Sequence, residues 1–82
     1  MMTEYEAVAQ IQLLCKMSLN DVRGLNNCNQ AQLTFIVQSY IDDQIVPSLT
    51  VWQQIAAILQ KVPQYAPIAT SIISVVAALI AL

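Results

Sequence analysis

Residues 44–82 read QIVPSLTVWQQIAAILQKVPQYAPIATSIISVVAALIAL, and Lys61 is the only charged side chain among these 39 positions. Across the whole chain of 82 residues, 57% of the side chains are hydrophobic and only 10% are charged, against roughly 45–50% and ~25% in a typical domain. A chain this short hides only about 60–65% of its unfolded surface when it folds alone. We therefore expect residues 44–82 to need a burial partner.

Prolines divide this stretch into two helical segments, because proline lacks a backbone N–H and the residue before it is disfavoured in the α region. The first segment follows a cap at Ser48 or Thr50 and ends before Pro63, and the second runs from Pro67 to Leu82. The sequence thus predicts an apolar helical hairpin over 47–82, hinged between the two later prolines.

The hairpin supplies the expected contact residues, because its large side chains cover most of both helices. The predicted membrane or oligomer interface consists of Trp52, Ile55, Leu59, Ile68, Ile72, Val75, Val76, Leu79 and Ile80. Small side chains recur at spacings of four along the last segment and form a ridge that lets a second helix approach closely. This predicted close-packing ridge consists of Thr70, Ser74, Ala77, Ala78 and Ala81.

The preceding part, 1–46, carries amphipathic helical patterns. A capping box at Thr3 and Glu6 predicts a helix over about 4–17, and Ser18 with Asp21 predicts a short helical turn that Gly24 closes. Asn29 caps a third helix over about 30–46, on which apolar residues recur at i, i+3, i+4, i+7 and i+8. This amphipathic stripe consists of Leu33, Ile36, Val37, Tyr40 and Ile41.

These patterns predict an all-α fold, an irregular bundle of four to five short helices in which 1–46 and 47–82 form one structural unit. Several functions are disfavoured. The three cations, Lys16, Arg23 and Lys61, lie far apart, so the basic surface that nucleic acid requires is missing. No histidine accompanies Cys15 and Cys28, so we expect neither a metal site nor a cofactor.

Catalytic chemistry is disfavoured as well. Asp42 and Asp43 are adjacent, and neighbours i and i+1 do not face each other on a helix, so they are not expected to share a proton. Cys15 has no histidine to activate it as a nucleophile. We therefore expect no enzyme, no catalytic residue and no small-molecule substrate.

The first residues carry Glu4 and Glu6 where a secretory signal has positive charge and then an apolar core. We expect synthesis in the cytoplasm without a signal peptide, and a final location at a membrane or inside a macromolecular assembly. Residues 62–82 would reach ~30 Å as one helix, whereas the regular part from Pro67 would reach only about 24 Å.

Three modes of burial remain open: insertion into a membrane, packing in a homo-oligomer or larger protein assembly, and an unusually apolar monomer. The leading hypothesis is a non-enzymatic structural subunit of a multi-subunit complex, such as a virion or a membrane-bound complex, held through its C-terminal helices. One alternative is a membrane-permeabilising protein of the holin or pore-forming kind. The other is a soluble adaptor that presents the amphipathic stripe to a partner.

Overall fold

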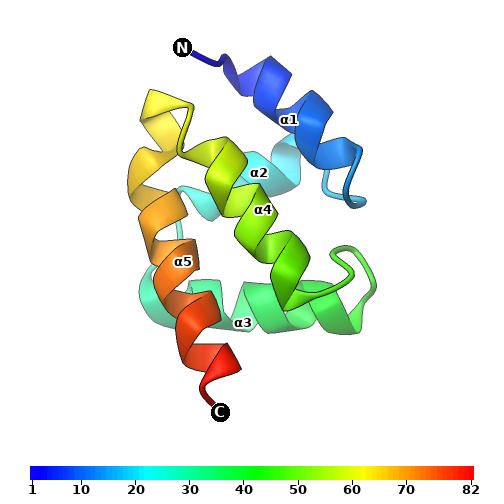
Figure 1. The fold of residues 1–82 in the computed structure, drawn as a ribbon, viewed down its shortest axis with the longest axis vertical. Helices are drawn as coiled ribbons and strands as arrows, with labels where there is room; N and C mark the ends of the chain where they lie inside the picture. The colour runs from blue at the N-terminus through cyan, green and yellow to red at the C-terminus, as the bar shows by residue number, and fades with distance from the viewer.

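The computed structural model describes every residue from Met1 to Leu82 and contains helices only, which confirms the all-α prediction. One short 3-10 turn, η1, precedes the last of the five α-helices (Figure 1). The elements are α1 (Glu4–Gln12), α2 (Leu19–Leu25), α3 (Gln30–Asp42), α4 (Leu49–Leu59), η1 (Pro63–Tyr65) and α5 (Ala66–Ile80).

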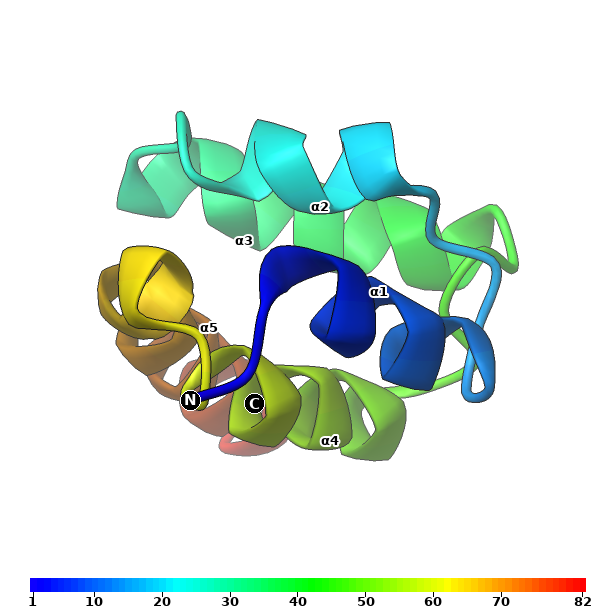
Figure 2. The same cartoon turned by 90° about the horizontal axis from the view of Figure 1, so that it is seen from above.

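The helices form two layers with α1 at one end. Figure 2 shows α2 and α3 on one side of the molecule and α4 and α5 on the other, with α1 between α2 and α4. The longest helix, α5, packs mainly against α4 and then against α3. Its last turn points away from the other helices at the free end of the chain (Figure 1). The N-terminal residues lie beside the turn that precedes α5, where the Met2 N–H donates to the Lys61 carbonyl and Glu4 accepts from the Tyr65 hydroxyl.

The helices begin where the sequence predicts, because each start depends on side chains within one turn of it. Three starts have a capping box, in which a side-chain oxygen accepts the N3 backbone N–H and the N3 side chain accepts the N-cap N–H. The pairs are Thr3 with Glu6, Ser18 with Asp21, and Asn29 with Gln32. At the start of α4 the Ser48 hydroxyl accepts the Val51 N–H at 3.3 Å.

The first helix ends earlier than predicted, at Gln12 instead of residue 17. The Lys16 N–H donates to the Ile45 carbonyl oxygen at 2.8 Å, which ties this segment to the loop that follows α3. Met17 is fully buried, and the backbone at Ser18 is extended as an N-cap requires. The backbone of residues 13–17 is therefore held in a non-helical conformation by a long-range hydrogen bond and by burial of the Met17 side chain.

Two other helix ends also differ from the predictions. Gly24 lies inside α2, which ends at Leu25 with a right-handed C-cap, so the expectation that this glycine closes the helix was wrong. The third helix ends at Asp42 and not near residue 46. Gln44 adopts a left-handed φ of 60°, and Ile45 N–H donates to the Tyr40 carbonyl at 2.8 Å, as in a Schellman motif.

All 20 buried residues are hydrophobic, and the hydroxyl of Tyr65 is the only polar side-chain group among them that makes a hydrogen bond, so hydrophobic contact is the main interaction in the core. Trp52 and Tyr65 are its largest fully buried side chains. The Trp52 ring stacks on Tyr40 with ring centroids 6.0 Å apart, and the Trp52 indole N–H has no hydrogen-bond partner. The core extends from Ala7 on α1 to Val76 on α5, so both halves of the chain build it together.

Shortening the fully buried Ile72 on α5 to alanine should lower the free energy of unfolding by about 2–5 kcal/mol, because the change leaves a cavity among α3, α4 and α5. Chemical denaturation followed by circular dichroism measures the change. The matched control is Ile80→Ala on the same helix, where the side chain is 57% exposed and the cost should stay below about 1 kcal/mol. Equal costs for the two variants would contradict the burial of this face of α5.

Candidate interaction surface

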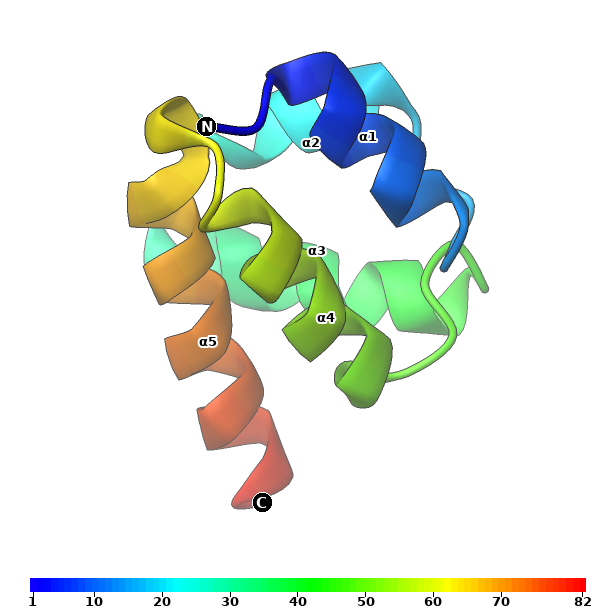
Figure 3. The same cartoon turned by 45° about the horizontal axis from the view of Figure 1, so that its top comes forward.

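Helix α5 carries no charge on either of its faces, but one face is buried in the core and the other is exposed. The inner face packs into the core through Ile68, Ala69, Ile72, Val75 and Val76. The outer face has no neighbour within the chain, and Figure 3 shows α5 running along the edge of the molecule to the C-terminus. Helices at the surface of a globular protein normally carry charged side chains on the outward face. The outer face of α5 carries none.

The predicted close-packing ridge lies on this outer face. Its members are all exposed: Thr70, Ser74, Ala77, Ala78 and Ala81. The Thr70 hydroxyl donates to the Ala66 carbonyl at 3.2 Å, and the Ser71 hydroxyl beside the ridge donates to the Pro67 carbonyl at 3.3 Å. These two hydroxyls are therefore satisfied within α5, and the Ser74 hydroxyl is the remaining polar side-chain group on the ridge.

Large apolar side chains border the ridge. Ile73 is 43% exposed and Ile80 is 57% exposed, and Leu82, which follows the end of the helix, is 99% exposed. We call the ridge together with Ile73 and Ile80 the outer face of α5. Removing such a surface from water is favourable in proportion to its apolar area.

The residues predicted to form a membrane or oligomer interface are mostly placed inside the chain's own core. Seven of the nine are buried: Trp52, Ile55, Leu59, Ile68, Ile72, Val75 and Val76. Leu79 is partly buried and Ile80 is exposed. In this conformation only the end of α5 offers predicted interface residues to an outside partner. An interface that uses the other seven stays a prediction, and it requires α4 or α5 to leave the bundle.

The amphipathic stripe of α3 also faces inward. Leu33 and Val37 are fully buried, while Ile36, Tyr40 and Ile41 are partly buried and pack against the core. The stripe is thus used in folding, and little of it remains for a partner in this conformation.

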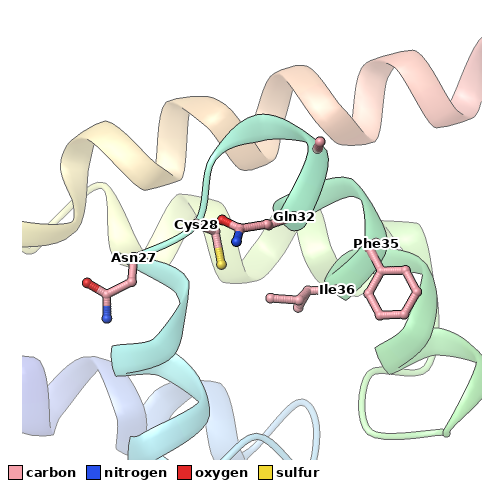
Figure 4. Close-up of a pocket in the computed structure, with 6 residues that line it drawn as sticks. Asn27, Cys28, Gln32, Phe35 and Ile36 are labelled. Atoms are coloured by element: carbon pink, nitrogen blue, oxygen red, sulfur yellow. The ribbon is translucent and has the colours of Figure 1, made fainter.

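An exposed aromatic residue on α3, Phe35, lies outside the apolar stripe that the helical spacing defines. Phe35 is 73% exposed on α3 and falls outside the stripe spacing. It borders an open hollow between the end of α2 and α3, which Figure 4 shows with Asn27, Cys28, Gln32 and Ile36 around it. The exposure of Phe35 was not predicted from the sequence, although a large aromatic residue among the polar positions of an amphipathic helix is a usable signal. None of the hollow's lining residues is charged.

The segment Pro63–Ile80 is long and apolar enough to cross a membrane by length and composition. A third of it, 33%, is buried inside the bundle. The core helix of a protein that never enters a membrane can meet the same criterion, so this property by itself is weak support for insertion.

Polar contacts between the N-terminal helices and the turn that joins α4 to α5 gather around Glu4. The Glu4 carboxylate accepts hydrogen bonds from Arg23 Nε at 2.9 Å and from the Tyr65 hydroxyl at 2.7 Å. Nearby, the Met2 N–H donates to the Lys61 carbonyl at 3.2 Å. Glu4 is 61 positions before Tyr65, so sequence pattern alone could not pair them.

These contacts shift the pKa values of both partners. The hydrogen bond from Arg23, and then the one from Tyr65, hold the pKa of Glu4 below its ordinary value of 4.5. Burial, and then the hydrogen bond to Glu4, raise the pKa of Tyr65 to about 12.

The two cysteines lie on separate segments, and burial raises the pKa of each thiol above its ordinary value of 9.0. Their Sγ atoms donate to the carbonyls of Ile11 and Gly24. Little thiolate is therefore present at neutral pH.

No three His, Cys, Asp or Glu side chains come together as a metal would require.

Comparisons with protein-family models, with curated proteins and with solved structures return no significant match to this chain. What the outer face of α5 does must therefore be inferred from its own residues.

Stability should fall on both sides of neutral pH. Glu4 and Glu6 have lowered pKa values in the folded chain, so their contribution is complete above about pH 4.5 and is lost as the pH falls through the folded values. Tyr65 has a raised pKa, so its contribution is complete below pH 10.0 and is lost as the pH rises toward 12. Urea denaturation between pH 3 and pH 11, followed by circular dichroism, measures both limbs.

Three further groups act on the alkaline side. The thiols of Cys15 and Cys28 start the loss near pH 9.0, and the Tyr40 hydroxyl adds to it above pH 10.0, because burial raises the pKa values of all three in the folded chain. The variant Tyr65→Phe should make the limb above pH 10 less steep, with the part due to Tyr40 remaining, and leave the acid limb present. An unchanged alkaline limb in this variant would count against the Tyr65–Glu4 contact.

Proposed function

We propose that this chain is a non-enzymatic structural subunit that joins a larger assembly through the outer face of α5. The supporting observation is that this exposed face lacks any charge along the whole helix, while the inner face already serves the core. A monomer in water gains nothing from such a surface, because exposed apolar area is unfavourable and promotes association. Covering it with protein would stabilise the assembled state.

A second copy of the same chain suits this face. Small side chains on α5 allow two helix backbones to approach closely, and close approach increases the number of favourable van der Waals contacts. The helix is about 22 Å long, so one pair of α5 helices covers less than the ~800 Å² per partner of a stable dimer. We therefore expect association that strengthens when further copies or flanking surfaces add area. The apolar hairpin of α4 and α5 would act as the attachment unit.

The variant Ser74→Leu tests this proposal, because it adds bulk to the exposed ridge without entering the core. Self-association measured by sedimentation velocity over a range of concentrations should weaken by at least tenfold. Gln53→Leu is the matched control, since it adds a similar side chain at an exposed position on α4. The control should associate like the unmodified chain. A Ser74→Leu variant that associates as strongly as the control would refute α5 as the contact helix.

A second candidate function is that of a membrane-permeabilising protein, in which the α4–α5 pair inserts into lipid and oligomerises. The observation that favours it is the segment Pro63–Ile80, whose length and composition meet the requirement for a membrane span. Lipid removes the hydrophobic force that holds α5 in the bundle, because acyl chains are as apolar as the core. The helix could then leave the bundle without losing stabilisation from that source.

Release of a trapped dye from phosphatidylcholine vesicles tests the second candidate. Protein at micromolar concentration should release the dye and remain with the vesicles on flotation. Ser74→Asp should abolish the release, because this exposed position leaves the core intact while a charge in the middle of α5 is costly in lipid by about 2.5–3.5 kcal/mol. Intact vesicles in the presence of the unmodified chain would exclude this function and leave the assembly proposal standing.

A further inference from the structure

We propose that the polar contacts around Glu4 form a clasp that controls whether α5 stays in the bundle or enters an uncharged lipid bilayer. The clasp consists of Glu4, Arg23, Tyr65 and the hydrogen bond from Met2 to Lys61. This inference rests on the second candidate function, because it describes how that function would be regulated.

The clasp joins three parts of the chain at the turn between α4 and α5. Glu4 lies in the first turn of α1, Arg23 lies on α2, and Tyr65 ends η1 directly before α5. Arg23 donates to Glu4 through both Nε at 2.9 Å and its terminal nitrogen at 3.3 Å. The Glu4 side chain is 15% exposed and Tyr65 is 1% exposed, whereas the Arg23 side chain is 49% exposed. Hydrogen bonds to an ionised group are stronger than neutral ones, and the bond from Tyr65 is the one of these that is partly shielded from water.

A weaker contact supports the same turn. The Asn26 side-chain amide, which follows α2, donates to the Gln64 carbonyl at 3.4 Å. The Met2 N–H donates to the Lys61 carbonyl at 3.2 Å, on the other side of Pro63. The backbone of the turn is therefore fastened on both sides of the first hinge proline.

Beyond this turn, α5 has no polar contact with the rest of the molecule. Every hydrogen bond made from Ala66 to Leu82 stays within α5 or its own start, including those of Thr70 and Ser71. No salt bridge reaches α5, because the helix carries no charge. Only hydrophobic packing therefore holds its inner face against α4 and α3.

Lipid affects the hydrophobic packing of α5 and the polar contacts of the clasp differently. Hydrophobic packing of α5 loses its driving force next to lipid, since the inner face can be covered equally well by acyl chains. The clasp gains nothing from lipid, because a carboxylate and a guanidinium are costly to transfer into an apolar phase. Contact with a bilayer therefore weakens the packing of α5 but does not favour opening of the clasp, so the clasp opposes the release of α5.

The chemistry of α5 specifies an uncharged bilayer as the acceptor. The released helix has no cation to attract anionic headgroups, and the chain as a whole has a net charge of −2. Pro63 begins both the hinge and the segment that is long enough to span a membrane. Release at the clasp would thus free that entire segment.

Hydrogen exchange of the full chain in buffer tests the clasp. The variants Tyr65→Phe and Glu4→Gln each weaken it while keeping the shape of the side chain. Exchange of the α5 amides should become about tenfold faster in each variant, as expected for loss of one charge-assisted hydrogen bond, while α3 amides change little. Glu6→Gln is the matched control, because it removes the same charge from the same helical turn at a residue outside the clasp.

Flotation with phosphatidylcholine vesicles separates the clasp from the function on which it rests. Faster α5 exchange together with at least threefold more vesicle-bound protein in both clasp variants supports the proposal. Exchange that matches the Glu6→Gln control overturns the clasp, whatever the vesicles bind. Faster exchange in α5 without increased flotation shows that the clasp holds α5 but that lipid does not receive it, which overturns the proposed release into a bilayer.

Discussion

The packing of the inner face of α5 against α4 and α3 is the contact on which the rest of the structure depends. Residues 44–82 contain one charge and many large apolar side chains, and these apolar side chains have no favourable alternative in water. Folding hides one face of α5 and leaves the other uncovered. Each fully buried Ile or Val contributes roughly 1.5–3 kcal/mol, which is a large part of the stability of a small domain. The same helix thereby stabilises the bundle and supplies an exposed surface that carries no charge.

The two candidate functions make opposite demands on α5. Assembly through the outer face keeps the inner face where it is, and the partner adds a second layer of packing to an intact bundle. Membrane insertion requires the inner face to leave the core. Polar contacts lie only at the start of the helix, around Glu4 and Tyr65, so the structure places its directional bonds beside the hinge and leaves the remainder of α5 to hydrophobic contact.

Helix starts were predictable because a capping box needs only residues three positions apart, as at Thr3, Ser18 and Asn29. Helix ends were less predictable. Gln44 takes the left-handed position that usually belongs to glycine, while the single glycine lies inside α2. The residues predicted to form an interface were recognisable as residues to be buried, but periodicity does not say whether the covering surface is the same chain, another chain or lipid.

By itself the sequence determined the helical class, the positions of the helix starts and the uncharged character of the last two helices, because these follow from neighbouring residues and from composition. Only the tertiary structure decided which side of α5 is covered, that the ridge from Thr70 to Ala81 faces outward, and that Glu4 meets Arg23 and Tyr65. The physical reason is that α5 is apolar on nearly every side. Its orientation therefore depends on the shapes of α3 and α4, which are distant in sequence and become neighbours only when the chain folds.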